Sequence, residues 1–409
     1  MSPVCPTEKC TGCSACVNIC HMNAVSLKPD STGFLYPEIN GDICVGCNKC
    51  RNICPQNTAT GYNSCGDFFA GVSFDDEVKE QSSSGGIFSL VAESIIKKGG
   101  VVFGAAYDDQ LEVKHIAVEY VNDLHKLRGS KYTQSVIGDT YLQVKKLLFK
   151  NRFVLFSGTP CQIDGLYAFL GKDASHKKLY TVDVLCHGVP SPEILKEFIR
   201  NENSRYGEQI TALNFRSKST GWLHYSTNLK FKNGSKKEIY RDDFMRGFLS
   251  NYYLRECCYD CRYSKTERIG DITLGDFWGY REKAPAFLED DNRGISLVIV
   301  NNEHGYELIK SIRSKAALVK KNADEAIAGN PVLHTPSKRP EDYEEFHKDY
   351  TNMSWDEISS KYFPVGDFVP PAITEENKSY FSQPFKKRYY KHLLACKFAE
   401  FKSKINGGK

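Results

Sequence analysis

The chain has 409 residues, of which 41% are hydrophobic, and a formal net charge of +4 at pH 7; this length exceeds what one hydrophobic core usually serves, so we expect two or three domains. Its 16 cysteines would indicate disulfides in a secreted protein, but no charged-then-apolar leader follows Met1, so we expect reduced thiols and a cytoplasmic protein. No run approaches the roughly eighteen apolar residues of a membrane-spanning helix, which argues against a protein that crosses the bilayer.

Two cysteine runs with the same spacing, C-x2-C-x2-C-x3-C, open the chain. In this spacing a short loop wraps three thiolates around one 4Fe-4S cluster and sends the fourth to another. The pattern predicts two 4Fe-4S clusters, one held by Cys10, Cys13, Cys16 and Cys54 and the other by Cys44, Cys47, Cys50 and Cys20. Zinc is the alternative, but it usually takes two cysteine pairs separated by a longer loop. Cys5 belongs to neither set and is expected to be a loose terminal thiol.

These eight cysteines make about the first sixty residues resemble bacterial two-cluster ferredoxins. The sequence departs from that family once, because His21 follows Cys20 where proline is usual. The resemblance implies an α+β ferredoxin-like domain over residues 1–62.

Strand-like and helix-like segments alternate from Phe68 onward. Residues 68–72 are predicted to form a strand and residues 87–98 an amphipathic helix. Small residues ahead of that helix leave backbone amides free for an anion, so we predict a phosphate cradle at Ser83, Ser84, Gly85 and Gly86. A second glycine-marked turn could hold a nucleotide with Ser130, Lys131, Tyr132, Gln134 and Ser135. The alternatives are an ordinary helix cap and a surface loop.

Two later segments share the order strand, short turn, helix, which indicates parallel strands with a ligand site at their carboxyl ends. In the first, residues 153–157 precede a turn with Gly158 and Thr159, and Cys161 enters the helix. A thiol in the first turn of a helix is expected to have a lowered pKa, which suits a nucleophile or a metal ligand. In the second, residues 179–185 precede Cys186 and His187, and Ser191 is expected to cap the helix.

A C-x2-C pair, Cys258 and Cys261, could complete a third 4Fe-4S site together with Cys161 and Cys186. The spacing leaves open whether Cys257 or Cys258 is the ligand. Two alternatives remain: Cys161 acts as a nucleophile with His187 as its base, or these cysteines are buried as small hydrophobic residues.

The segment around Asn233 and Gly234 predicts a β-hairpin inserted between these sites. A further strand then ends at Asp276, which could be a cap or a hydrogen-bond acceptor in the site. Trp278 could be a core residue or could border a flat ring. From Asn322 the chain is charged and proline-marked, which predicts a linker-like passage.

Residues 377–409 contain nine lysines and arginines against one glutamate, a net charge of +8 that leaves the remainder at −4. Apolar residues recur there at helical spacing, which predicts a basic amphipathic helix. This helix could pack on its own domain or lie on an anionic membrane surface. Nucleic acid is not expected, because no basic face is readable in the rest of the chain.

Taken in order, the motifs resemble the beta-subunit family of coenzyme F420-reducing hydrogenases and dehydrogenases over about residues 65–340. They are Ser84-Gly85-Gly86, Gly129-Ser130-Lys131-Tyr132, Gly158-Thr159-Pro160-Cys161-Gln162, Cys186-His187-Gly188, the Cys258/Cys261 pair and Gly275-Asp276-Phe277-Trp278-Gly279. The resemblance implies an α/β domain over residues 63–340 with FAD and a nearby 4Fe-4S cluster, and a C-terminal extension over residues 341–409. It carries the cradle, the glycine-marked turn, Gly158, Thr159, Asp276 and Trp278 over as contacts to these cofactors.

The function implied by this resemblance is a cytoplasmic oxidoreductase that moves electrons between the clusters and a hydride-exchanging substrate at FAD. That substrate is coenzyme F420, a deazaflavin, or an unidentified organic molecule, with His187 and Lys131 as candidate proton donors. A soluble ferredoxin or a redox partner subunit is the expected partner. Two alternatives are a non-catalytic electron-transfer subunit of a larger complex and a redox accessory protein in surface polysaccharide biosynthesis.

Overall fold

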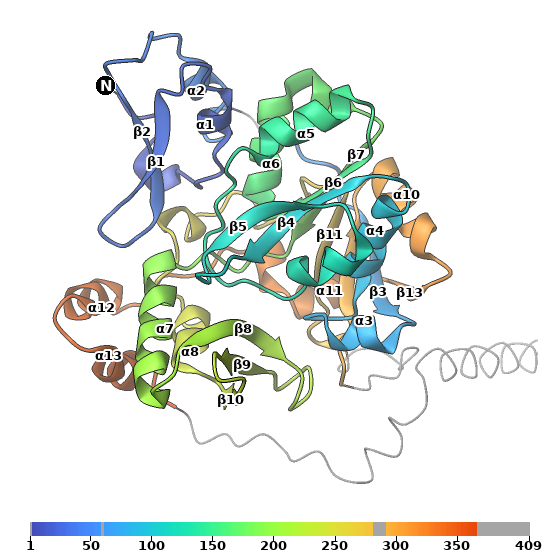
Figure 1. The fold of residues 1–409 in the computed structure, drawn as a ribbon. Coiled ribbons are helices and arrows are strands. Elements are labelled where there is room, and N and C mark those ends of the chain that lie inside the picture. The colour runs from blue at the N-terminus through green and yellow to red at the C-terminus, as the bar shows by residue number, and fades with distance from the viewer. Residues whose placement is uncertain (1, 59–60, 281–291, 366–409) are drawn as a thin grey trace, which may run out of the picture.

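The computed structural model describes residues 2–58, 61–280 and 292–365 of the chain. Within these ranges the strands form sheets of two, three and eight strands. Figure 1 shows the eight-stranded sheet in the middle of the molecule, with the two smaller sheets at its periphery.

The N-terminal cysteine-rich segment (residues 2–58) holds two short helices and an antiparallel strand pair. Each helix starts directly after a residue in the left-handed conformation, Ser14 with φ 65° and Asn48 with φ 56°. Gly12 and Gly46, two positions earlier, also have positive φ, which glycine adopts without strain. The two cysteine loops therefore share one backbone form. The elements are η1 (Thr7–Lys9), α1 (Ala15–Ile19), β1 (Val25–Pro29), β2 (Leu35–Ile39) and α2 (Lys49–Asn52).

The central sheet has the strand order β13-β3-β12-β11-β7-β6-β4-β5. Its consecutive strands β11, β7, β6 and β4 are parallel, so their carboxyl ends reach the same edge. The predicted strand–turn–helix units are confirmed as β6 with α6 and β7 with α7, whose N-caps are Thr159 and Ser191. The strands are β3 (Asp67–Ser73), β4 (Val101–Tyr107), β5 (Val113–Val118), β6 (Val154–Gly158), β7 (Leu179–Val184), β11 (Ile272–Asp276), β12 (Ser296–Val300) and β13 (Ala316–Lys321).

Helices cover both faces of the central sheet. Leu155 of β6 packs in one hydrophobic core with α4 and α10, whereas its neighbours Val154 and Phe156 pack in another with α5 and α6. Side chains along a strand point alternately to opposite faces, so each strand fills both cores and is hydrophobic throughout. The helices around the sheet are α3 (Asp76–Glu80), α4 (Ile87–Ile96), η2 (Val121–Leu127), α5 (Thr140–Phe149), α6 (Pro160–Leu170), η3 (Gly171–Ser175), η4 (Glu256–Cys258) and α10 (Glu303–Ile312).

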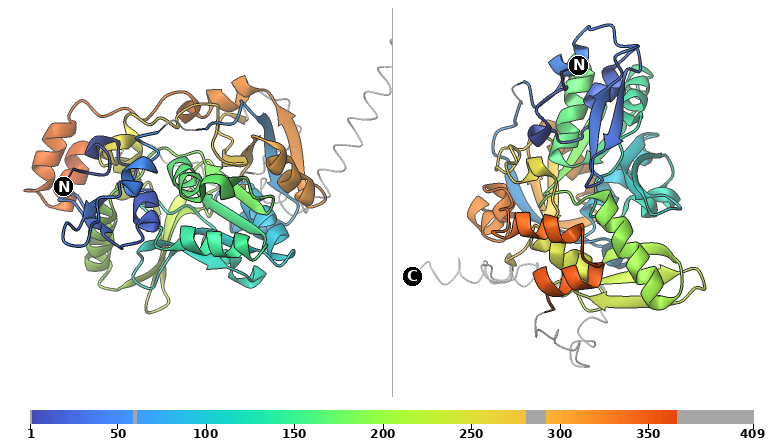
Figure 2. Two further views of the ribbon diagram at one scale, coloured as in Figure 1. Left: turned by 90° about the horizontal axis from the view of Figure 1, so that it is seen from above. Right: turned by 90° about the vertical axis from the view of Figure 1, so that its left-hand side faces the viewer.

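The cysteine-rich segment lies against α5 and α6, as Figures 1 and 2 show. Helix α1 contacts both of these helices, and η1 contacts η4. The cysteines of the first sixty or so residues are thereby held beside the start of α6, which carries Cys161.

A second hydrophobic core forms below the central sheet in Figure 1, around the three-stranded sheet β10-β9-β8. The segments on either side of Asn233 and Gly234 are β9 and β10, which pair antiparallel, and β8 extends them to three strands. The core also takes in two helices from residues 341–365. Its elements are α7 (Pro192–Tyr206), β8 (Ile210–Ser217), β9 (Ser226–Phe231), β10 (Lys236–Tyr240), α8 (Asp243–Leu249), α12 (Tyr343–Tyr350) and α13 (Trp355–Tyr362).

The prediction of a linker-like passage from Asn322 is wrong. Residues there form α11 (Ala323–Ala328) and η5 (Pro331–Leu333), and Ala326 and Leu333 are fully buried against the central sheet. The prolines mark tight turns rather than a spacer. The predicted basic helix over residues 377–409 lies outside the described residues. None of the described helices is both long and apolar enough to span a membrane.

Candidate iron-sulfur sites and an adjoining cleft

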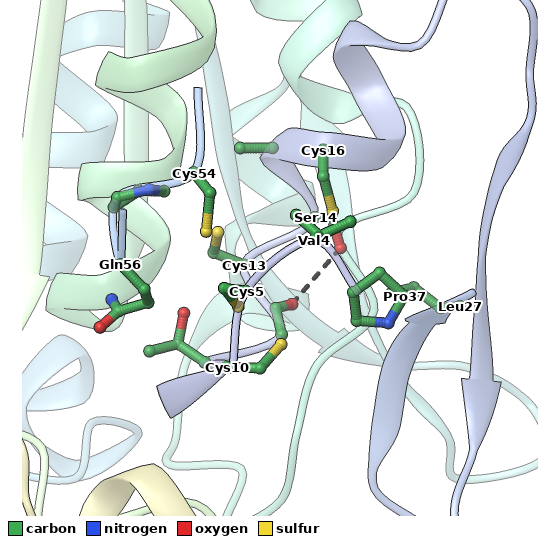
Figure 3. A pocket seen from close by; sticks show the side chains of 14 residues that line it. Val4, Cys5, Cys10, Cys13, Ser14, Cys16, Leu27, Pro37, Cys54 and Gln56 are labelled. Carbon is green, nitrogen blue, oxygen red and sulfur yellow. Dashed lines mark hydrogen bonds between the residues drawn. The ribbon is translucent and has the colours of Figure 1, made fainter. Parts of the chain in front are cut away.

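One predicted ligand set surrounds a small cavity in the cysteine-rich segment. Figure 3 shows the four thiols, Cys10, Cys13, Cys16 and Cys54, around this cavity together with Cys5. The expectation that Cys5 is a loose terminal thiol is wrong, since it is only 7% exposed. Hydrogen bonds to Cys10 and Cys54 raise the pKa of Cys5, so it is a buried neutral donor beside the predicted ligands.

The second predicted set, Cys20, Cys44, Cys47 and Cys50, lines a cavity of about 250 Å³. Each short helix serves both sets, because Cys16 and Cys20 lie on or next to α1, and Cys50 and Cys54 on or just after α2. This is the spatial form of the x3 spacing. Cys47 is exposed, so the second cavity is the one that reaches the molecular surface.

A third cavity, of about 560 Å³, brings together cysteines that are far apart in sequence. Cys161 lies in the first turn of α6, Cys186 follows β7, and Cys258 closes η4. Cys261 completes the predicted set, and Cys257 also lines the cavity. The parallel sheet makes this assembly possible, because β6 and β7 are neighbours whose carboxyl ends point the same way.

The thiols of the third cavity suit iron coordination better than nucleophilic chemistry. Burial raises the pKa of Cys161, contrary to the lowered pKa expected for the first turn of a helix. His187, the proposed base, instead donates from Nε2 to Oδ1 of Asn251 at 2.6 Å. No three ligand-type side chains among residues 2–58, 61–280 and 292–365 converge closely enough to hold a single ion. Thiols spread around a cavity fit a cluster, in which each binds a different iron.

A cleft of about 550 Å³ lies at the carboxyl edge of the central sheet. Most of the predicted cofactor contacts line it: Ser83, Ser84, Gly86, Ser130, Lys131, Tyr132, Ser135, Gly158, Thr159, Asp276 and Trp278. Two predicted contacts do not. The amide of Gly85 donates to Ser296 Oγ at 2.9 Å, and Gln134 Oε1 accepts from Arg255 Nη1 at 3.1 Å. Gly85 is therefore used in packing, and Gln134 faces the cysteine-rich segment.

The serine-rich wall of the cleft has donors free for an anion. Helix α4 begins after Gly86, whose φ is 86°, and no side chain caps it. The hydroxyl oxygens of Ser83 and Ser130 are 3.0 Å apart. Ser84 Oγ is buried without a hydrogen-bond partner among the described residues. An uncapped helix start beside free hydroxyls fits a phosphate group.

The opposite wall combines aromatic rings with a buried ion pair that no sequence motif marks. Arg216, on β8, lies 2.8 Å from the Asp276 carboxylate, and Trp222 Nε1 donates to the same carboxylate at 2.6 Å. The rings of Trp222 and Trp278 stack with centroids 4.8 Å apart. The Arg216 guanidinium lies 4.1 Å from the Tyr225 ring centre, and its buried Nε has no partner within the described part of the chain. This wall can face a flat, polar ring.

A fixed hydrogen-bond chain forms the wall of the cleft between β5 and β6. Gln162 Nε2 donates to Ser135 Oγ at 2.9 Å, and Ser135 lies 3.0 Å from His115 Nδ1. Because Nε2 of His115 faces the Ser157 carbonyl oxygen at 3.0 Å, Nε2 carries the proton. Burial lowers the pKa of His115 to about 4, so this histidine is neutral near pH 7. His115 was not predicted, because no local pattern marks it.

The two predicted proton donors both line the cleft. Lys131 Nζ donates to the carbonyl oxygens of Arg128 at 2.7 Å and Lys126 at 3.1 Å, and has no carboxylate partner among the described residues. Burial lowers its pKa to about 7. His187 packs edge-on to Phe248, and burial lowers its pKa as well.

The cavities adjoin one another through shared lining residues. Cys186, His187 and Thr159 line both the cleft and the third cavity. Thr11 and Gln56 line both the third cavity and the first. The first and second cavities are joined through α1 and α2. A continuous row of sites therefore runs from the exposed Cys47 to the cleft.

Comparisons with known proteins agree with this arrangement. Residues 9–58 match the 4Fe-4S dicluster domain, and residues 151–326 match the family described as the C terminus of the coenzyme F420 hydrogenase/dehydrogenase beta subunit. No curated protein matches the chain significantly. A chain from the F420-reducing NiFe hydrogenase complex of Methanosarcina barkeri shares 17% identity with a TM-score of 0.45, over 67% of this chain and 87% of that chain. That likeness is too low to support an argument. On the two family matches, the chain belongs to the coenzyme F420 hydrogenase/dehydrogenase beta-subunit family and carries a domain for two 4Fe-4S clusters at its N-terminus.

Proposed function

We propose that this protein is an iron-sulfur flavoprotein oxidoreductase, with FAD in the cleft and a third 4Fe-4S cluster in the cavity beside it. The observation that carries the proposal is the shared wall: Cys186 and His187 line both the cleft and the cavity of the third thiol set. A cofactor in the cleft would lie next to a cluster held by Cys161, Cys186, Cys258 and Cys261. Electrons would have a short path between them.

The thiol sets supply the ligands. Cys10, Cys13, Cys16 and Cys54 hold the first N-terminal cluster, and Cys20, Cys44, Cys47 and Cys50 hold the second. Cys257 stays outside the third set because it pairs with Cys258 through a thiol hydrogen bond, which lowers the pKa of Cys258 and favours its thiolate, the form that binds iron. The three sites span the molecule from its surface to the cleft.

The cleft residues divide into two groups toward FAD. Ser83, Ser84 and Ser130, with the uncapped start of α4, hold the phosphates. Trp278 and Arg216 border the ring system. When bound, FAD supplies the exchange between a hydride and single electrons.

Lys131 is the group that holds an exchangeable proton in this cleft. Its ammonium donates only to backbone carbonyls of Arg128 and Lys126, and burial lowers its pKa to about 7. It can therefore release or take up a proton near neutral pH. His187 is a second such group, at the wall toward the third cavity.

The substrate that this proposal favours is the deazaflavin coenzyme F420, because the family that residues 151–326 match is described by it. The partner is a soluble ferredoxin or a redox subunit that meets the chain at the second cluster, since Cys47 is exposed there.

The test is anaerobic purification followed by iron, sulfide and flavin analysis. We expect about twelve irons, in three clusters of four, and one FAD per chain. Spectral titration with reduced F420 should then bleach the flavin, and titration with reduced ferredoxin should reduce the clusters. Eight irons without flavin would contradict the proposal and leave only the dicluster domain. Full cofactor content without a response to F420 would rule out F420 as the substrate.

A further inference from the structure

Arg255 joins the cysteine-rich segment to the rest of the protein from a fully buried position, with 1% of its surface exposed. Its Nε donates to the carbonyl oxygen of Cys10 at 2.7 Å, and Nη2 donates to the carbonyl oxygen of Leu35 at 3.0 Å. Its Nη1 donates to Oε1 of Gln134 at 3.1 Å. One guanidinium therefore binds two parts of the cysteine-rich segment and one residue outside it.

The same guanidinium lies beside a predicted cluster ligand. Nη2 is 3.6 Å from Cys10 Sγ, and the planar group sits 4.0 Å from the ring centre of Tyr36. No carboxylate pairs with Arg255 within residues 2–58, 61–280 and 292–365. A buried charge needs a partner of opposite sign, because leaving one unpaired costs several kcal/mol. The negative charge within reach is that of the Cys10 thiolate and the cluster it holds.

The backbone of Arg255 links this group to the third cavity. Arg255 directly precedes η4, and its carbonyl oxygen accepts from the amide of Cys258 at 2.8 Å. Its own amide donates to the carbonyl oxygen of Val189, which lines that cavity, at 2.9 Å. The residue thus contacts the first thiol set through its side chain and the third through its main chain.

We propose that Arg255 is a positioning residue that raises the reduction potential of the first N-terminal cluster and holds that cluster in place beside the third cavity. When a 4Fe-4S cluster takes up one electron, its net charge becomes one unit more negative. A nearby cation stabilises that reduced form, and hydrogen bonds to the sulfurs act in the same direction. The effect is strong for a buried pair, because little water screens it. This inference rests on the proposed ligand set that contains Cys10 and does not depend on FAD.

Arginine suits this place better than lysine. Its planar fork reaches several acceptors at once, here Cys10, Leu35 and Gln134, whereas a lysine ammonium is a point charge. Gly12 leaves the room for it, since a β-carbon there would lie 3.3 Å from Arg255 Nη1. A lysine at this position would keep the charge and lose most of the contacts.

The experiment is an anaerobic redox titration of the full chain, followed by electron paramagnetic resonance. Arg255→Met should lower the midpoint potential of one N-terminal cluster and leave the other unchanged. Lys28→Met is the matched control: it removes one positive charge from β1 in the same segment, but Lys28 is exposed, so solvent screens it and neither potential should move. Arg255→Lys should keep a potential closer to that of the unsubstituted protein, while the cysteine-rich segment becomes easier to cleave by limited proteolysis.

Unchanged potentials in an Arg255→Met protein with full iron content would overturn the inference. Should Arg255→Met lose iron, Arg255→Gln, which keeps a donor for the Cys10 carbonyl, takes its place in the titration under the same criterion. Loss of iron from both neutral variants but not from Arg255→Lys would support the pairing of charge with the cluster. Loss from all three would reduce Arg255 to a packing role and overturn the effect on potential. A protein without FAD would contradict the proposed flavin site and leave this titration fully interpretable.

Discussion

Gly165 of α6 lies directly against Cys13 of the cysteine-rich segment. A β-carbon on Gly165 would come within 2.8 Å of the Cys13 Cβ and 2.9 Å of its Sγ. Cys161, in the third thiol set, is one helical turn earlier on the same helix, a rise of about 6 Å. Helix α6 is therefore a rigid spacer between the first and third thiol sets, and the missing side chain at Gly165 permits their close approach.

Enlarging residue 165 should push the cysteine-rich segment away from α6. We expect Gly165→Val to destabilise the protein by about 1–3 kcal/mol through overpacking. It should also slow electron transfer between the first and third clusters, measured by rapid reduction and freeze-quench spectroscopy. Ala168→Val, a half-buried position on the same helix, is the control. Equal behaviour of the two variants would contradict the spacer role of Gly165.

Cys5 and Cys10 make a matched pair for the ligand assignment, because both are buried at the first cavity. Cys10→Ala should remove one cluster, or about four irons. Cys5→Ala should retain them, because Cys5 acts only as a thiol donor to Cys10 and Cys54. Iron analysis and electron paramagnetic resonance of the anaerobic proteins measure both outcomes. If Cys5→Ala lost the cluster instead, Cys5 would have to be counted as a ligand.

The adjacent pair Cys257 and Cys258 tests the third set. Both line the third cavity. We expect Cys258→Ala to lower the iron content by about four, and Cys257→Ala to leave it unchanged. The same loss is expected for Cys161→Ala, measured by the same iron assay. The reverse result for the pair would exchange the two residues in the ligand set, and no loss from any of the three would remove the third cluster.

The buried ion pair of the cleft wall should be sensitive to loss of one partner. Side chains of Arg216 and Asp276 are 4% and 13% exposed. Asp276→Asn leaves the Arg216 cation buried without its counter-charge, which typically costs about 3–5 kcal/mol. Urea unfolding of the variant measures this loss, and flavin content should fall with it. The double variant Arg216→Met/Asp276→Asn should recover part of the stability; a double variant no more stable than Asp276→Asn would contradict the charge argument.

Lys131 predicts a particular dependence of stability on pH. Burial lowers its pKa from 10.5 to about 7 in the folded chain, so the unfolded chain binds its proton more tightly. Between these two pKa values the unfolded state holds more protons, and stability therefore rises with pH through this window. Below about pH 7 the lysine is charged in both states and the full cost of burying the charge remains.

In Lys131→Met that rise should be absent, as measured by thermal unfolding at a series of pH values. Lys150→Met, at an exposed position, should keep it. An identical pH profile in all three proteins would show that Lys131 keeps its ordinary pKa.

Local patterns were enough to predict the elements and loops that depend on neighbouring residues. The starts of α6 and α7 follow from a capping residue and a proline, whose effects act within one helical turn. The ligand sets of the cysteine-rich segment are read from spacing for the same reason. The prediction failed where packing decides: residues 323–333 are buried rather than a linker, and Cys5 is enclosed by thiols from both cysteine runs.

The amino-acid sequence by itself determined that two short loops carry thiols at the spacing of iron-sulfur clusters, because each loop needs only its own backbone to present them. Only the tertiary structure decided which distant groups meet. Arg255 and Cys10 are 245 positions apart, and Arg216 and Asp276 are 60 apart; neither pair leaves a local pattern. Such contacts exist because parallel strands deliver their carboxyl ends to one edge and α6 holds the cysteine-rich segment there, a result of burying hydrophobic surface across the whole sheet.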